Sequence, residues 1–377
     1  MRRIMMKRTI ALLCAAVLTV GLLSGCVTST EEPTAETTGT ENQTEAAAPA
    51  ETAELNENEL NIYTALEDEQ LTDYLTEFRE LYPDVQINIT RDSTGIITSK
   101  LLAEKDNPVA DVVWGLSATS LLVLEQEGML EPYAPEGVDR VLPEFKDDAE
   151  VPTWVGIDAW ETAFLVNKEV LKSKGVDTVP HSYADLLDPQ YKGLIAMSNP
   201  ASSGTGLLTV NGILQLMGEE EGWNYLDKLH ENVAVYLHSG SQPAKATASG
   251  EYGIGVSFGY RCIKSAADVG SDIAEVVFPE EGSGWDIEAN ALIKKDGIKD
   301  ISKTFLDWAI TDNIMVKYAA GYPIVSIGFD EGEIPEGYEK NPLEQLISMD
   351  FGKAAAERED ILAEWTNRYD GKSAPKE

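Results

Sequence analysis

One order of segments recurs along this chain. A short apolar run is followed by a loop of small hydroxyl residues and glycine, and then by an amphipathic helical stretch. Alternating strands and helices of this kind are typical of parallel sheets with helices on their faces. The sequence therefore predicts the α/β class, with two mainly parallel sheets flanked by helices. The strands are expected at 61–63, 85–89, 110–114, 194–197, 233–236, 254–257 and 275–278.

Two longer extended segments, 153–167 and 285–293, separate the two sets of strands. They are predicted to cross between two lobes and to act as a hinge. The first lobe is expected at 55–155 and the second at 156–287. Residues 288–377 are expected to return to the first lobe and to end in C-terminal helices.

The N-terminus has the pattern of a secretory signal. Four basic residues precede an apolar run from Thr9 to Leu23, and Leu23-Ser24-Gly25-Cys26 follows. This pattern resembles the lipobox of bacterial lipoproteins, in which the cysteine carries fatty acyl chains such as palmitate. A transmembrane helix is the weaker interpretation, because a span needs roughly 20 apolar residues. We therefore expect a signal peptide at 1–25 and an extracytoplasmic protein anchored to the cell membrane by lipid on Cys26.

Residues 26–54 follow as a predicted disordered acidic tether rich in Thr, Glu, Ala and Pro. The whole chain has a formal net charge of -36. A protein this acidic is not expected to bind nucleic acid or anionic lipid by charge. Of the three cysteines, Cys14 leaves with the signal peptide and Cys26 is expected to be acylated, so Cys262 is expected to be a buried free thiol without a disulfide partner.

The sequence contains no motif for a metal or a phosphate-binding cofactor, and its context suggests no Ser/His/Asp catalytic set. C-x-x-C, H-E-x-x-H and the P-loop pattern do not occur, and the three histidines are scattered. We therefore expect a protein that is not an enzyme.

Three loops share a design that suits an anion. The clearest is 198–206, and the others are 91–95 and 63–66. A helix N-terminus exposes backbone N–H groups and partial positive charge, and glycine allows a ligand to approach closely. These loops predict an anion site built from two lobes. Its donors are Thr64, Ser93 and Thr94 from the first lobe, and Ser202, Ser203, Gly204 and Thr205 from the second.

The alternative for each hydroxyl is ordinary helix capping. Residues 64–67 also fit a capping box that begins a helix. Two roles therefore remain for Thr64, capping of this helix and donation to the ligand. Three hydroxyls and two glycines in 202–206 exceed what a cap requires, which favours a ligand there. For Ser239-Gly240-Ser241, capping is favoured.

A second set of residues is aromatic and acidic. Carboxylates beside tryptophan suit an ammonium group through ion pairing and cation–π attraction. The alternative is that these tryptophans belong to the core and these acidic residues to the surface. Two roles also remain for Arg261, a ligand donor and a surface residue. The candidates for the cationic end of a ligand, with one tyrosine hydroxyl, are Trp114, Asp158, Trp160, Tyr260, Trp285 and Glu288.

Four runs carry a family resemblance. They are DVVWGL at 111–116, EGMLEPY at 127–133, NPASSGTG at 199–206 and GSGWD at 282–286. The chain resembles the extracellular solute-binding proteins of ABC importers, of the two-lobed type II periplasmic-binding fold, and within them the 2-aminoethylphosphonate-binding proteins. The resemblance implies a monomeric receptor that closes around a small phosphonate zwitterion and delivers it to an ABC permease, with no cofactor.

Other ligands remain open on the same fold. Receptors for ferric iron, phosphate esters and polyamines are related. The iron-binding relatives typically carry adjacent tyrosines, whereas Tyr318 and Tyr322 are separated here. A further alternative, from a different class, is an extracellular hydrolase of phosphorylated solutes.

Overall fold

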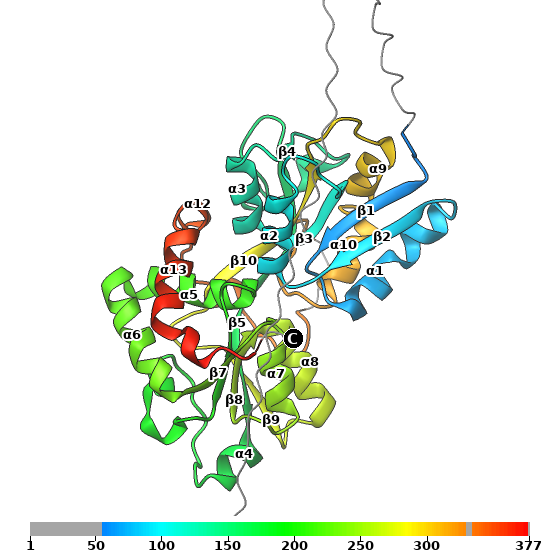
Figure 1. Ribbon diagram of the computed structural model, residues 1–377. Helices are drawn as coiled ribbons and strands as arrows, with labels where there is room; N and C mark the ends of the chain where they lie inside the picture. Colours follow the sequence, from blue (N-terminus) through cyan, green and yellow to red (C-terminus); the bar gives the residue numbers. More distant parts are fainter. Residues whose placement is uncertain (1–54, 329–333, 376–377) are drawn as a thin grey trace, which may run out of the picture. The chain divides into compact units, whose positions relative to one another are not determined.

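The computed structural model describes residues 55–328 and 334–375. The predicted signal peptide, lipobox cysteine Cys26 and tether lie outside these residues. The described chain builds two large hydrophobic cores, and each belongs to one of the two lobes seen in Figure 1. The first lobe contains β1 (Glu59–Thr64), α1 (Asp68–Leu81), β2 (Gln86–Arg91), α2 (Thr94–Ala103), β3 (Val112–Ser117), α3 (Ala118–Gln126), β4 (Leu130–Glu131), α9 (Asp300–Trp308) and α10 (Asp312–Ala319).

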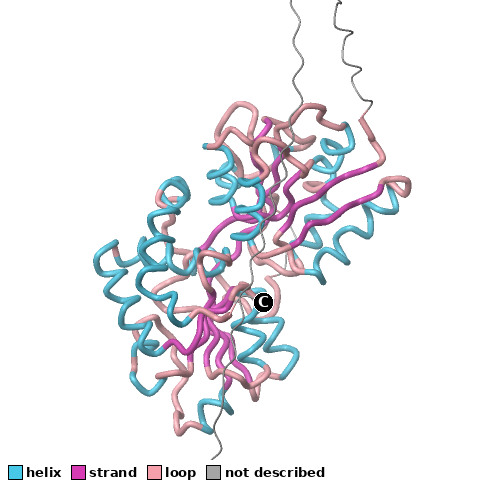
Figure 2. The backbone as a smooth tube through the Cα atoms, viewed as in Figure 1, coloured by secondary structure: helices cyan, strands magenta, loops and turns pink. Residues whose placement is uncertain are grey.

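The second lobe follows the same plan. Its strands lie between helices that cover both faces of the sheet (Figure 2). Its elements are α4 (Lys168–Ser173), β6 (Ile195–Ser198), α5 (Gly204–Met217), α6 (Glu219–Asn232), β7 (Val233–Leu237), α7 (Gln242–Ala248), β8 (Ile254–Phe258), α8 (Gly259–Val269) and β9 (Ala274–Val277). The segment after 334 adds α11 (Pro342–Gln345), α12 (Phe351–Ala356) and α13 (Arg358–Tyr369).

Two long strands, β5 (Trp154–Asn167) and β10 (Trp285–Ile293), join the lobes. The first half of β5 pairs antiparallel with β10, and its second half pairs with β8 and β9. The strands form one continuous sheet in the order β2-β1-β3-β10-β5-β8-β6-β7. The predicted α/β class and both crossing segments are confirmed. The sheet is mixed, because the crossing strands run against the parallel pairs β1–β2, β1–β3, β6–β7 and β6–β8.

The first core is rich in aromatic residues. Trp114 at the centre of β3 is fully buried, and its indole N–H donates to the Tyr318 hydroxyl over 3.0 Å. The Phe305 ring meets it edge-on at 5.3 Å between centroids. Such packing fixes β3 and the loop after it, which positions the first-lobe side of the site.

The C-terminal helix crosses to the second lobe. Ile361, Trp365 and Tyr369 of α13 belong to the second core, whereas the return through Ile327 belongs to the first. The sequence placed 288–377 in the first-lobe return and C-terminal helices, and did not predict where the last helix packs. Its apolar residues are few, so their spacing could not identify the partner surface.

The helix after β1 begins later than the sequence predicted. Thr64 is the last residue of β1, and the capping box consists of Glu67 and Gln70 at the start of α1. The Glu67 backbone N–H donates to the Gln70 side chain over 2.8 Å. The predicted capping box at 64–67 is therefore wrong by three residues. None of the helices within 55–328 and 334–375 is long and apolar enough to cross a membrane.

Candidate ligand-binding site

Residues from both lobes and from both crossing strands surround one cavity. It measures about 50 Å³, and a single water needs roughly 10–15 Å³ on the same measure. The cavity therefore suits a small solute. Its lining is predominantly polar and consists of Ala65, Glu67, Gln70, Arg91, Ser93, Thr94, Gly115, Ser117, Trp160, Ser203, Gly204, Thr205, Ser239, Gly240, Phe258, Glu288 and Tyr322.

One side of the cavity is formed by two helix N-termini. Ser93 is the N-cap of α2 in the first lobe, and Ser203 is the N-cap of α5 in the second. The Ser203 hydroxyl accepts from the Gly206 N–H over 3.2 Å, so it caps its own helix. Exposed N–H groups and partial positive charge from both helices converge on this side. An anion placed here would interact favourably with both lobes.

Glycine allows these two helix ends to touch. A Cβ on Gly204 would lie 2.6 Å from the Thr94 side chain, and one on Gly95 would lie 2.8 Å from the Ala201 carbonyl oxygen. Side-chain atoms do not pack that closely, so any larger residue would push the lobes apart. The contact brings the donors of α2 and α5 within reach of one small anion.

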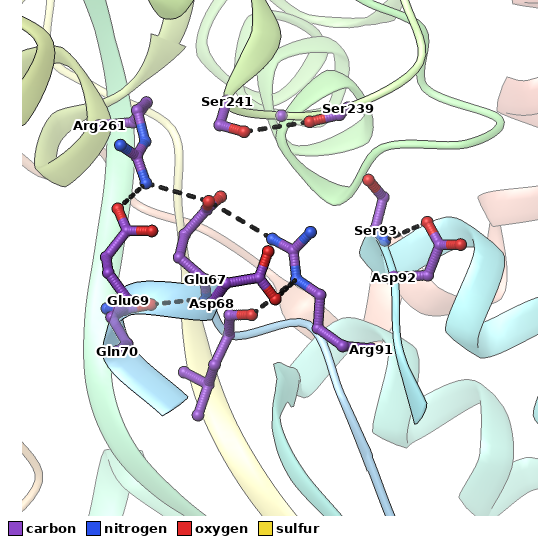
Figure 3. A network of polar contacts seen from close by, with 12 residues as sticks. Glu67, Asp68, Glu69, Gln70, Arg91, Asp92, Ser93, Ser239, Ser241 and Arg261 are labelled. Carbon is purple, nitrogen blue, oxygen red and sulfur yellow. Dashed lines mark hydrogen bonds and ion pairs between the residues drawn. The ribbon is translucent and has the colours of Figure 1, made fainter. Parts of the chain in front are cut away.

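The loop 239–241 also reaches the N-terminus of α5, although the sequence favoured a helix-capping role for this loop. Ser239 and Gly240 line the cavity. Ser241 is the N-cap of α7, and its side chain makes no capping bond in the described structure; it lies 3.1 Å from the Ser239 hydroxyl (Figure 3). A Cβ on Gly240 would overlap the Thr205 hydroxyl, so glycine is required for this approach.

Arg91 is a cavity residue that the sequence reasoning missed. It ends β2 directly before the Ser93 loop, which is the signal that could have found it. Its Nε donates to the Leu66 carbonyl over 2.9 Å, and its Nη2 lies 3.4 Å from the Glu67 carboxylate (Figure 3). These contacts fix a guanidinium at the cavity wall beside the helix N-terminus.

The crossing strands bring buried carboxylates to the cavity. Asp158 on β5 and Glu288 on β10 are directly opposed in the antiparallel pair. Glu288 lines the cavity, and its buried Oε2 has no hydrogen-bond partner among the described residues. Burial, with a smaller effect of Glu67, raises the pKa of Glu288 to about 8. A cation at this position would restore the charged form.

Asp158 lies behind Glu288. It is fully buried, and neither of its oxygens finds a hydrogen-bond partner in the part of the chain that the structure describes. Burial, followed by the charges of Glu288 and Glu161, raises the pKa of Asp158 well above its ordinary value. Two carboxylates this close favour a shared proton or an added positive charge.

An ion-pair cluster joins the lobes beside the cavity. The Glu67 carboxylate lies 3.0 Å from Arg261 Nη2 on α8, and Arg261 also contacts Glu69 (Figure 3). The same carboxylate lies 3.6 Å from Lys245 on α7. Burial lowers the pKa of Arg261, but the two carboxylates outweigh it and raise the pKa overall. Arg261 is thus a buried residue that contacts the other lobe, and not a surface residue.

The structure places seven of the predicted site residues in the cavity lining and six outside it. Ser93, Thr94, Trp160, Ser203, Gly204, Thr205 and Glu288 line it. Of the other six, Asp158 lies behind Glu288, as described. Thr64 is fully buried at the end of β1, and its hydroxyl accepts from the Leu66 N–H. Ser202 pairs with His238 Nδ1 at 3.2 Å.

The three aromatic residues outside the lining have structural partners. Trp114 belongs to the first core. The Trp285 indole donates to the Ile347 carbonyl over 2.8 Å. Tyr260 stacks on Tyr322 with 5.5 Å between ring centroids, so it supports a lining residue from behind.

A metal centre is not indicated in the described ranges. No group of three or more His, Cys, Asp or Glu side chains there is arranged to hold an ion. Cys262, the free cysteine of the described chain, is buried as expected.

Comparisons with known proteins agree with this architecture. The sequence profile of the bacterial extracellular solute-binding proteins matches residues 107–333. An uncharacterized protein of Haemophilus influenzae is 31% identical over 299 residues, which cover 76% of this chain and 84% of the relative. A probable ABC transporter periplasmic-binding protein of Sinorhizobium fredii is 26% identical over 68% of this chain and 70% of its own length.

Solved structures give the same result. The periplasmic binding protein AfuA from Actinobacillus pleuropneumoniae, solved with fructose-6-phosphate bound, has a TM-score of 0.75 and 28% identity; the match covers 83% of this chain and 98% of AfuA. Iron-bound HitA from Pseudomonas aeruginosa, at 19% identity and a TM-score of 0.68, shares the fold over 81% of this chain and 98% of its own. This chain belongs to the bacterial extracellular solute-binding protein family.

Proposed function

We propose that this protein is the extracytoplasmic receptor of an ABC importer and that it captures a small phosphonate zwitterion, such as 2-aminoethylphosphonate, between its lobes. The observation that carries the proposal is one cavity whose lining combines groups that suit an anion with a group that suits a cation. The N-termini of α2 and α5, where Gly204 approaches Thr94, supply the first, and the buried carboxyl of Glu288 supplies the second.

The anionic end of the ligand belongs at the helix ends. A phosphonyl group offers three oxygens and carries up to two negative charges. The first-turn N–H groups of α2 and α5 can donate to it together with the hydroxyls of Thr94 and Thr205. Arg91 adds a positive charge at the cavity wall. An anion held by donors of both lobes stabilises the closed arrangement, which is the hinge mechanism that we propose.

The cationic end belongs at Glu288. An ammonium group there would pair with the Glu288 carboxylate and offset the desolvation that raises the pKa of this carboxyl. The Trp160 ring, which is 6% exposed and lines the same cavity, can add a cation–π contribution. A lining that suits both an anion and a cation supports a zwitterion over inorganic phosphate.

A sugar phosphate is a second candidate. AfuA, at 28% identity, was solved with fructose-6-phosphate, and carboxylates such as Glu288 can accept bonds from sugar hydroxyls. The cavity volume of about 50 Å³ favours the smaller ligand. The name of the Sinorhizobium fredii relative supports an ABC permease as the partner. Lipid on Cys26 would hold the monomeric receptor beside that permease.

Isothermal titration calorimetry on the purified protein separates the candidates. The ligands are 2-aminoethylphosphonate, inorganic phosphate, fructose-6-phosphate and ferric citrate. The proposal predicts that the phosphonate binds at least tenfold more tightly than the others. Tight binding of the sugar phosphate or of iron, without a response to the phosphonate, would contradict it. Phosphorus NMR of the same mixtures tests the hydrolase alternative, because any released product would indicate an enzyme.

A further inference from the structure

The segment 370–374 follows α13 and lies beside β7, the strand at one edge of the sheet. A parallel bridge and a hydrogen bond of 2.9 Å from the Ala374 N–H to the Tyr236 carbonyl join the segment to β7. Lys372 donates to the Val233 carbonyl over 2.7 Å and anchors the segment at the start of the same strand. The second lobe thus has an additional length of chain fixed along its sheet edge.

The segment bonds directly to the loop 199–203 between β6 and α5, which we call the anion loop. Asn199 Nδ2 donates to the Ser373 hydroxyl over 2.9 Å, and that hydroxyl donates to the Asp370 carboxylate over 2.8 Å. Asn199 Oδ1 accepts from the Ala201 N–H over 2.8 Å. Both ends of the Asn199 amide are therefore paired, one within the loop and the other with the segment.

His238 makes a second connection between the segment and the anion loop. Its Nε2 lies 2.8 Å from the Ala374 carbonyl oxygen, and its Nδ1 lies 3.2 Å from the Ser202 hydroxyl. A carbonyl oxygen can only accept, so Nε2 carries the hydrogen, and Nδ1 of the neutral ring accepts from Ser202. The imidazole thus links the backbone of the segment to the loop through two hydrogen bonds.

The anion loop determines where the second-lobe donors lie. The Asn199 carbonyl accepts from the N–H of Ser203, the N-cap of α5, over 2.9 Å. The loop also meets the first lobe, because a Cβ on Gly95 of α2 would lie 2.8 Å from the carbonyl oxygens of Ala201 and Ser202. A shift of the loop would therefore change both the direction of the first N–H groups of α5 and the contact between the lobes.

We propose that the segment 370–374 positions the anion loop for ligand binding, and that Ser373 and His238 are positioning residues of the site. Neither belongs to the described cavity lining, so both act through the loop. A loop that is held in its binding conformation before the ligand arrives loses less conformational entropy on binding. The inference rests on the proposed function, because it assigns the residues that hold the same anion-binding helix N-terminus.

Calorimetry with 2-aminoethylphosphonate and amide hydrogen exchange of the ligand-free protein test the inference on the full chain. Ser373→Val and Ser373→Thr introduce side chains of the same shape, and only threonine keeps the hydroxyl. In Ser373→Val we expect roughly three- to tenfold weaker binding, the effect of one lost neutral hydrogen bond, and faster exchange of the amides at 199–206. Ser373→Thr should restore both values. His238→Phe removes both ring nitrogens and should repeat the two effects of Ser373→Val.

Thr366→Val is the matched control, because the Thr366 hydroxyl on α13 bonds the Leu362 carbonyl of its own helix. It should keep the wild-type affinity and exchange. Peptides from β3, in the first lobe, should exchange as in the wild type in every variant, which separates a local effect on the loop from a general loss of stability.

Wild-type exchange at 199–206 in both Ser373→Val and His238→Phe would overturn the inference. Faster exchange there with unchanged affinity would overturn the role of the segment in ligand binding. Failure of the wild type to bind 2-aminoethylphosphonate would overturn the proposed function, and the exchange comparison alone would then decide whether the segment holds the loop.

Discussion

Arg261 on α8 and Glu67 at the start of α1 form an ion pair across the two lobes, with 3.0 Å between Nη2 and Oε2. Their side chains are 5% and 9% exposed, so solvent screens the pair weakly. Lys245 and Arg91 face the same carboxylate at 3.6 and 3.4 Å. The lobes are therefore held together by charge as well as by the contact between Thr94 and Gly204.

Arg261→Met should favour the open form. The change removes the buried cation but keeps the apolar stem, and it leaves Glu67 with Arg91 and Lys245. We expect about tenfold weaker phosphonate binding, mainly through faster dissociation, and a larger radius of gyration of the ligand-free protein. Stopped-flow dissociation and small-angle X-ray scattering measure the two effects. Arg140→Met, at an exposed pair with Asp312 inside the first lobe, is the control. Equal dissociation rates for both variants would show that Arg261 does not hold the lobes together.

Gly204→Ala should block closure. The added Cβ would lie 2.6 Å from the Thr94 side chain of the other lobe. Overpacking of this kind costs about 1–3 kcal/mol, so we expect phosphonate affinity to fall roughly ten- to hundredfold. Gly371→Ala, where a Cβ would meet no described atom within 4 Å, should bind normally. Wild-type affinity in Gly204→Ala would mean that ligand binds without contact between the helix ends.

Thr205→Ala tests the anion side. Loss of its hydroxyl should weaken phosphonate affinity by about 1–3 kcal/mol while the melting temperature changes little. Thr209→Ala is the matched control, since Thr209 is equally buried on α5 and its hydroxyl bonds the Thr205 carbonyl at 2.9 Å. If Thr205→Ala lowers the melting temperature and leaves the affinity unchanged, Thr205 serves the helix and not the ligand.

The ligand-free protein should lose stability as pH rises. The pKa of Glu288 is raised to about 8, against about 4.3 in an unfolded chain, so the folded state holds the extra proton between these values. The free energy of unfolding must then fall as pH rises from about 5 through about 8. Urea titrations at several pH values measure this decline.

Glu288→Gln should make that decline shallower, because its amide does not titrate. Part of the slope should remain, since burial also raises the pKa of Glu161 to about 8 and of Asp286 to about 6. Glu219→Gln, at an exposed position on α6, is the control and should keep the full slope. A wild-type slope in Glu288→Gln would contradict the assigned protonation.

The fold was largely predictable because its signals are local. The apolar runs of β1, β6 and β8 and the two crossing strands each stand out in sequence, and their ends differ from the predicted ends by only a few residues. The helix after β1 was misplaced because Thr64-x-x-Glu67 matches the capping-box pattern, whereas the observed box begins at Glu67, which is not among the preferred N-cap residues. The Thr64 hydroxyl instead accepts from the Leu66 N–H.

The site was predictable where loops follow strands, as at Ser93 and Ser203. It was not predictable where a role depends on distant partners. The sequence left Arg261 as either a ligand donor or a surface residue, whereas its side chain is buried against Glu67, which lies 194 residues away. Trp114 and Trp285 look like ligand contacts, but their N–H groups are taken by Tyr318 and Ile347. Sequence spacing carries no information about such long-range pairs.

A crystal structure of the protein grown with 2-aminoethylphosphonate tests the central claim most directly. The account predicts density for the phosphonyl group between the N-termini of α2 and α5, within hydrogen-bond distance of Thr94 and Thr205, and for the ammonium group at Glu288. A ligand bound to one lobe alone, or with its phosphonyl group away from both helix ends, would contradict it.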